Sequence, residues 1–193
     1  MATLLLKFNA PIQSWGTSLK LKDHDTDQYP SKSGVIGMIA SALGRKRNDD
    51  ISDLVNLRFG VRIDQAGLII DDFQVSEVPA KEKKIGHRKY ITDADFTCGI
   101  EADDKIIENI KEALQHPANA LFLGRRGCPV TIDLIEKITQ DSLEDALNDY
   151  DKTAGSKRII MDSCEPGGEM VRDIPLSFSP SDRKYKYRFI TIR

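Results

Sequence analysis

A pair of adjacent arginines between glycines is the segment of this chain with the clearest capacity for chemistry. Residues 121–129 read L-F-L-G-R-R-G-C-P, so an apolar run ends in a loop that carries two guanidinium groups. Glycine accepts backbone conformations with φ > 0 and allows another backbone to come close. Arginine presents a rigid fork of donors that matches phosphate groups and base edges. The pattern indicates a loop that can hold a polyanion, with an ordinary solvated surface loop as the alternative.

Acid–base cleavage of RNA is a second chemistry that the residue types allow. Without a metal ion, this reaction needs one group to deprotonate a 2′-hydroxyl and another to protonate the leaving oxygen. The chain has three histidines. His116 stands at the end of a predicted helix, where a cation suits the helix dipole, so we interpret it as structural. His87, which is followed by Lys89 and Tyr90, is the candidate for catalysis.

Metal and cofactor sites are not indicated by the sequence. His24 stands among three aspartates, but the spacing is that of a loop and matches no defined metal-ligand motif. Neither G-x-x-x-x-G-K-[ST] nor G-x-G-x-x-G occurs. The three cysteines are odd in number and far apart, which excludes a complete disulfide framework and paired zinc ligands. We therefore predict no metal ion and no cofactor.

The composition is that of an ordinary soluble protein with segregated charge. The 193 residues are 40% hydrophobic and 30% charged, and the net charge is −2. No apolar stretch approaches the ~20 residues that a membrane span needs, so we expect a cytoplasmic protein without membrane contact. Basic clusters occur at 45–47, 81–89, 125–126 and 183–193, while 133–151 is acidic. This distribution suits one RNA-binding face and other faces for protein neighbours.

Apolar periodicity in the first half of the chain predicts the elements that position these groups. In order, we expect a strand at 2–9, a loop at 11–30, a helix at 34–43, a short helix within 49–57 and strands at 59–64 and 68–75. Ser33 is the predicted cap of the longer helix, and Gly44 its predicted end. The last two strands are expected to pair as a hairpin.

The second half of the chain completes a recognisable order of elements. We expect an exposed loop or hairpin tip at 76–89, a strand at 90–100, a helix at 103–115 and a strand at 120–123. The resulting βαββαβ order is that of ferredoxin-like domains, which RNA-recognition modules share. Short strands follow at 157–161, 170–174 and 185–192. We predict an α+β protein with a ferredoxin-like, RRM-like domain at 1–130 and a small β-rich C-terminal subdomain at 131–193.

Four segments in combination resemble a known family. They are P-I-Q-S-W-G at 11–16, P-S-K-S-G-V-I-G-M-I-A-S-A-L-G at 30–44, R-K-Y-I-T-D-A-D-F at 88–96, and the L-F-L-G-R-R-G-C-P segment at 121–129. The chain resembles the CasD family, the CRISPR-associated RAMP proteins that cap the 5′ end of the guide RNA in type I-E Cascade complexes. The resemblance covers about residues 1–130 and is weak over the last third.

The resemblance implies a non-catalytic subunit that binds the 5′ handle of CRISPR RNA in antiviral defence. It implies two neighbours, the Cascade backbone subunit and the large PAM-recognising subunit, and a basic thumb hairpin at about 76–92. Type I-C relatives process the guide precursor with a Tyr, a Lys and a His. A metal-independent endoribonuclease that uses His87, Lys89 and Tyr90 is therefore the alternative.

The candidate RNA-binding residues lie in or beside the four family-like segments. Trp15 is predicted either to stack on a base or to anchor the core. The set is Gln13, Trp15, Lys32, Ser33, Arg45, Arg47, Arg88, Tyr90, Gly124, Arg125, Arg126 and Cys128.

Overall fold

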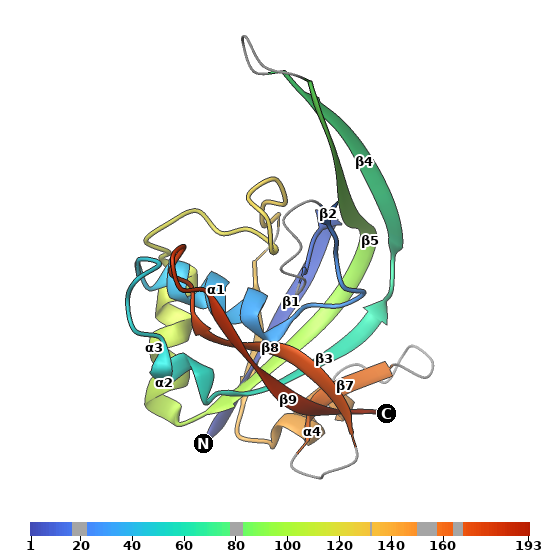
Figure 1. Cartoon of the computed structure of the whole chain (residues 1–193). Helices are drawn as coiled ribbons and strands as arrows, with labels where there is room; N and C mark the ends of the chain where they lie inside the picture. Colours follow the sequence, from blue (N-terminus) through green and yellow to red (C-terminus); the bar gives the residue numbers. More distant parts are fainter. Residues whose placement is uncertain (17–22, 78–82, 132, 150–157, 164–167) are drawn as a thin grey trace.

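The computed structural model describes residues 1–16, 23–77, 83–131, 133–149, 158–163 and 168–193 (Figure 1). The strands are β1 (Ala2–Gln13), β2 (Asp23–His24), β3 (Arg58–Gln65), β4 (Leu68–Ser76), β5 (Lys84–Ala102), β6 (Ile135–Thr139), β7 (Arg158–Ser163), β8 (Glu169–Ser177) and β9 (Lys184–Ile192). The helices are α1 (Lys32–Ala42), α2 (Ser52–Val55), α3 (Asp104–Gln115) and α4 (Leu143–Asp149). The molecule is thus a mixed α/β protein, as the α+β prediction required. Among the described residues, no helix is both long enough and apolar enough to span a membrane.

A long antiparallel sheet forms the frame of the molecule. Its strand order is β6-β1-β5-β3-β7-β9-β8, while β2 and β4 also pair with β5. All of these pairings are antiparallel except that of β2 with β5. Helices cover the two faces of the sheet, which explains why Leu4, Leu5 and Leu6 are all buried without alternation. Leu4 and Leu6 pack in the main core with α1 and α3, whereas Leu5 packs on the other face in the cluster that contains Leu147 of α4.

Helix α1 begins at Lys32, earlier than the predicted start at residue 34. The hydroxyl of Ser31 accepts the amide of Gly34 at 3.2 Å, so Ser31 is the N-cap and the predicted cap at Ser33 is wrong. Ser31 has the extended backbone that a cap requires, whereas Ser33 lies within the helix. Gly44 has φ +76°, which confirms that the helix ends there.

The two strands that were predicted to pair as a hairpin, 59–64 and 68–75, both pair with β5 instead. β3 pairs with the inner part of β5, and β4 pairs with the outer part of β5, from Leu68↔Thr92 to Ser76↔Lys84. The predicted pairing of 59–64 with 68–75 is therefore wrong, because these strands follow each other along one 19-residue strand. Gly67 turns the chain between them with φ +70°.

The β4–β5 pair leaves the body of the sheet and projects as an arm (Figure 1). Of the two alternatives predicted for 76–89, an exposed loop or a hairpin tip, the loop is wrong for residues 84–89, which belong to β5 and pair antiparallel with β4. Phe73 lies opposite His87 and Val75 opposite Ile85, so cross-strand pairs stabilise a segment whose basic residues suggested a loop. Residues 78–82 lie outside the described residues.

The strand predicted at 120–123 is not formed. Phe122 makes only an isolated bridge with Pro129, because the chain folds back on itself within a few residues. The strand that pairs with β1 on this side is β6, which the sequence analysis did not predict.

The three C-terminal strands were predicted correctly and appear as β7, β8 and β9. They continue the same sheet, since β7 pairs with β3. The division of the chain into 1–130 and 131–193 stays a prediction, although β6 and β7 hydrogen-bond across it.

Candidate nucleic-acid interface

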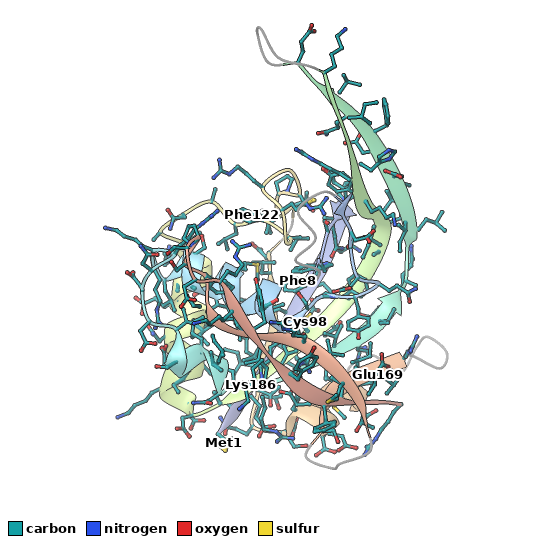
Figure 2. All side chains as sticks on the ribbon, in the orientation of Figure 1. Met1, Phe8, Cys98, Phe122, Glu169 and Lys186 are labelled. Atoms are coloured by element: carbon teal, nitrogen blue, oxygen red, sulfur yellow. The ribbon has the colours of Figure 1, made fainter. Side chains whose placement is uncertain are left out.

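The segment 122–129, which we call the arginine loop, folds over the chain directly after β1. The amide of Ser14 donates to the carbonyl of Leu123 at 3.1 Å, and the amide of Leu123 donates to the carbonyl of Cys128 at 2.7 Å. Gly124 has φ +84°, and a Cβ atom there would lie 1.6 Å from the carbonyl oxygen of Ser14. Only glycine fits this contact. Figure 2 labels Phe122 at the start of the loop.

Arg125 joins the arginine loop to the family-like segment 88–96 and to the chain at Asp25. Its guanidinium donates to the carbonyl of Lys89 at 3.2 Å and to the carbonyl of Asp25 at 3.0 Å. The guanidinium carbon also lies 5.3 Å from the centroid of the Tyr90 ring, within cation–π range. The hydroxyl of Ser14 donates to the same Lys89 carbonyl at 3.2 Å. Three segments that are distant in sequence therefore meet at Arg125, while Arg126 beside it is exposed.

The candidate catalytic residues lie on β5, where side chains alternate between the two faces of the strand. His87 and Lys89 share one face, and Arg88 and Tyr90 share the other. Lys89 is paired with Asp25 at 2.7 Å, and the imidazole of His87 faces Asp71 at 3.1 Å. Arg88 is exposed. The regular strand thus separates His87 from Tyr90.

Gln13 and Trp15 are fully buried, which corrects the prediction that their side chains touch RNA. The Gln13 amide donates to the carbonyls of Phe8 and Ala94, each at 3.0 Å, and accepts the indole N–H at 3.0 Å. The Trp15 ring stacks on Phe8 with centroids 5.3 Å apart and lies directly against Gly34. All polar groups of the two side chains are satisfied internally, so Trp15 is the core anchor of the two alternatives. Both residues hold the floor of the site from beneath.

Lys32 and Cys128 are also turned inward. The ammonium of Lys32 pairs with Asp162 at 3.0 Å, and its backbone amide donates to Asp173 at 2.8 Å. The prediction that Lys32 contacts RNA is corrected, because the ammonium is buried in this pair. Cys128 is fully buried, and burial raises the pKa of its thiol. The thiol therefore packs the loop from inside, and the prediction that it contacts RNA is corrected as well.

Two adjoining clefts run between the arginine loop, α1 and the turn between β8 and β9. The narrower one has a volume of about 220 Å³ and includes Arg125, and the wider one has a volume of about 340 Å³. They share the lining residues Gly16, Gly34, Gly124 and Arg183, so we treat them as one basic groove. Four predicted residues, Ser33, Arg45, Arg47 and Gly124, line the wider part.

Positive charge dominates the lining of the basic groove. Among the described residues that line the groove, the only carboxylate is that of Asp25, in the narrower part. In the part of the chain that the structure describes, the side chains of Lys46, Arg47 and Arg183 have no ion-pair partner. Arg45 is different, since Asp53 binds it in a bidentate pair and its hydrogen bond lowers the pKa of Asp53.

Sequence reasoning missed the contribution of the C-terminal region to this groove. Arg183, Phe178 and Tyr185 line the wider part. The basic stretch at 183–193 was the available signal, but no family-like segment included it.

No group of three or more potential metal ligands occurs among the described residues. The side chains of Asp23 and His24 lie outside them.

The comparison with protein families decides what kind of protein this is. The model of the family described as CRISPR-associated protein (Cas5) matches residues 3–191. The chain belongs to the Cas5 family of CRISPR-associated proteins. A curated relative is the Cascade subunit CasD of Escherichia coli strain K12, which is 31% identical over 178 residues, covering 79% of this chain and 78% of that protein. The resemblance to the CasD family is confirmed, and the family match extends through the last third, where it was expected to be weak.

Solved structures agree with this Cas5 assignment. A protein solved as "Crystal structure of Cas protein" is 32% identical, with a TM-score of 0.80 over 99% of this chain and 93% of that chain. A chain of a "CRISPR RNA-guided surveillance complex" is 26% identical, with a TM-score of 0.83 over 99% of this chain and 89% of that chain.

Proposed function

We propose that this Cas5 protein is a subunit of a Cascade-type surveillance complex in the cytoplasm, and that its basic groove binds the 5′ handle of CRISPR RNA in antiviral defence. The observation that carries the proposal is that three of the four family-like segments, 11–16, 30–44 and 121–129, line one groove, where the described cations outnumber the one described carboxylate. Membership of the Cas5 family supports RNA as the ligand, and the basic groove is the site that we propose for a single strand of RNA. The relative CasD is named as a Cascade subunit.

The groove suits a flexible single strand of RNA better than a duplex. Single strands are bound by cations that follow the phosphates and by backbone donors that approach closely. Gly16, Gly34 and Gly124 leave the floor without side chains. Lys46, Arg47 and Arg183 are available for phosphates, because none of them is engaged by a carboxylate among the described residues. Arg125 is already oriented by two carbonyl acceptors, so it loses little freedom on binding.

Arg88 and Arg126 extend the proposed RNA surface beyond the groove. Both are exposed; Arg126 directly follows Arg125, and Arg88 lies two residues before Tyr90 on the same face of β5. Gly127 is exposed as well, with nothing within 4 Å of the position that a Cβ would occupy. The backbone of the arginine loop is therefore open to a phosphate on this side.

We infer that the fold is ferredoxin-like at its centre. In the ferredoxin-like pattern β1, β3, β5 and β6 take the places of its first, second, third and fourth strands. β1 and β3 flank β5, as a split βαβ unit requires, and β6 pairs with the other side of β1. The projecting β4–β5 pair corresponds in position to the thumb of RAMP proteins. Its described part carries Asp71 and Asp72 as well as Arg88 and Lys89, so it is less basic than the sequence suggested.

The arm and the outer strands are the surfaces that we assign to protein neighbours. Ile69, Phe73, Val75 and Ile85 share one face of the β4–β5 pair, and all are exposed. Exposed apolar side chains in contiguous groups mark interaction sites. We propose the backbone subunit and the large PAM-recognising subunit as the partners of this protein.

We propose a binding role without catalysis. The endoribonuclease alternative needs His87, Lys89 and Tyr90 to converge on one phosphate. Strand alternation places Tyr90 on the opposite face of β5 from His87 and Lys89, and Asp71 and Asp25 engage His87 and Lys89.

Purification of the complex that contains this chain provides the direct test. RNA extracted from the complex is sequenced from its 5′ end. We expect most molecules to begin with the same repeat-derived segment, and to be lost from complexes that lack this chain. RNA with unrelated 5′ ends would contradict the proposal.

A further inference from the structure

We propose that Phe178, Tyr185 and Arg183 form a stacking site for one unpaired base of the bound RNA. The inference rests on the proposed function and assigns a role to the turn between β8 and β9, which lies outside all four family-like segments. The ligand class is a single nucleotide within an RNA strand. The rings supply faces for the base, and Arg183 supplies a charge for the adjacent phosphate.

The three side chains form the wall of the wider part of the basic groove that faces α1. Both aromatic rings are half-buried, and Arg183 is exposed. Arg183 also lines the narrower part, so it stands where the two parts of the groove join. An RNA strand that follows the groove from Arg125 toward Arg47 passes these three side chains.

The shape of this part of the groove fits one nucleotide. Its volume of about 340 Å³ is at the lower end of the range for small-molecule sites, roughly 300–1,000 Å³. Base faces stack on aromatic side chains without regard to base identity. Among the described residues, no carboxylate lines this part, and Lys46 and Arg47, which also line it, have no ion-pair partner. A flat group flanked by negative charges is therefore favoured over an aromatic side chain of a protein partner.

Gly37 lines the wider part of the groove beside the tip of the Phe178 ring. A Cβ at Gly37 would lie 3.5 Å from the nearest ring atom, which is ordinary van der Waals contact. The helix would tolerate alanine there, and glycine inside a helix costs about 1 kcal/mol relative to alanine. Packing therefore does not require this glycine, while an added methyl group would occupy part of the groove beside the ring.

A buried ion network holds the aromatic wall in place before RNA binds. Arg188 of β9 pairs with Asp173 of β8 and with Asp162 of β7, each at 2.6 Å. Asp162 also binds the ammonium of Lys32 at 3.0 Å, and Asp173 accepts the Lys32 amide at 2.8 Å. The strands that carry the wall are thus fixed to the first residue of α1. A preorganised wall does not have to be ordered when the base binds.

Equilibrium binding of the full chain to single-stranded RNA with the repeat-derived 5′ handle tests this site. We expect Phe178→Ala and Tyr185→Ala each to lower the affinity roughly 5- to 150-fold. Tyr185→Phe should bind like the wild type, because it keeps the ring. Tyr187→Ala is the matched control, since Tyr187 is on the same strand but lines a different cleft.

A second RNA series separates stacking from a structural effect. Each handle nucleotide in turn is replaced by an abasic one. At one position the loss of the base should weaken RNA binding by the wild type. It should not weaken RNA binding by Tyr185→Ala or Phe178→Ala any further, because the base and the ring make the same contact. If every abasic position weakens the alanine variants as much as the wild type, the stacking site is wrong.

Gly37→Ala tests the site without removing a ring. We expect its melting temperature to equal or exceed that of the wild type and its affinity for the handle RNA to fall. If Arg125→Ala weakens binding while the Phe178, Tyr185 and Gly37 variants all bind like the wild type, the stacking site is overturned and the proposed function stands. If the wild-type chain, alone and in its complex, does not bind handle RNA, both proposals fail.

Discussion

The guanidinium of Arg125 lies over the ring of Tyr90, 5.3 Å from its centroid, although the two residues belong to different family-like segments. The same guanidinium is held by the backbone carbonyls of Lys89 and Asp25. Arg125 therefore connects the arginine loop to β5, and it also lies in the proposed RNA surface. Arg126, one residue further on, is exposed and has neither constraint.

This difference predicts distinct effects for the two arginines. Arg126→Ala should weaken handle-RNA binding by roughly 1–3 kcal/mol, as expected for loss of a charge-assisted contact, and leave the melting temperature unchanged. Arg125→Ala should weaken binding and also lower the melting temperature. Arg125→Lys should have an RNA affinity and a melting temperature as low as those of Arg125→Ala, because lysine cannot make the paired contacts of a planar fork. Filter binding and calorimetry measure the two effects, with exposed Lys105→Ala as the control. Wild-type affinity in the double alanine variant would remove both arginines from the site.

Gly124 and Gly127 form a matched pair for stability. Gly124→Ala should destabilise the protein by at least ~1–3 kcal/mol, because the residue has φ +84° and a Cβ would collide with the Ser14 carbonyl. Gly127→Ala should leave stability nearly unchanged, since nothing lies within 4 Å of its Cβ position. Chemical denaturation of both variants provides the measurement. Equal stability of the two would mean that the arginine loop does not rest on Ser14.

Asp53→Asn should raise the affinity for RNA. The substitution frees Arg45 from its bidentate pair, so one more cation becomes available in the basic groove. The slope of log K against log salt should steepen by about 0.7 for one additional contact with a single strand. Binding titrations at several salt concentrations measure this slope. An unchanged slope would show that Arg45 does not reach RNA.

The pairing of Arg45 with Asp53 also has a pH dependence. The hydrogen bond from Arg45 lowers the pKa of Asp53, so the stabilisation is complete above the ordinary carboxyl pKa. This stabilisation is lost as the pH falls through the lowered pKa that Asp53 has in the folded protein. The stability of Asp53→Asn should therefore approach that of the wild type only under strongly acidic conditions.

Cys128 should be unreactive in the folded protein. Burial raises the pKa of its thiol, and the thiolate is the form that alkylating reagents attack. Iodoacetamide at mildly alkaline pH should modify Cys128 only after unfolding, as measured by peptide mass spectrometry. Because the thiol ionises more readily in the unfolded chain, its contribution to stability is present below the unfolded pKa and declines as the pH rises above it. Rapid alkylation of Cys128 in the native chain would place it at the surface instead.

The purified protein should leave a repeat hairpin RNA intact, with or without EDTA. His87 and Tyr90 lie on opposite faces of β5, so they cannot act together on one phosphate in this conformation. Gel analysis of end-labelled RNA is the measurement. Cleavage at a single repeat position that is abolished by His87→Ala or Tyr90→Phe would establish the endoribonuclease alternative.

The sequence alone predicted the elements whose signals are local. The apolar spacing of Ile107, Ile110 and Leu114 predicted α3, and Gly44 marked the end of α1. The family-like segments predicted the family, because they combine rare local patterns. Local signals suffice here, since helix periodicity and glycine conformation depend on neighbours within a few residues.

Only the tertiary structure decided which polar and aromatic residues are buried and which line the basic groove. Gln13, Trp15 and Lys32 have residue types that suit RNA, but their partners Phe8, Ala94 and Asp162 come from other elements. The partner of β4 and the identity of β6 were likewise set by pairing with the distant strands β5 and β1.

The aromatic wall of the groove is the clearest case of this kind. Phe178, Arg183 and Tyr185 reach α1 only because β7 pairs with β3 and an ion network joins Arg188 to Asp173. Burial and hydrogen bonding between segments far apart in sequence determine such contacts, and no local pattern encodes them.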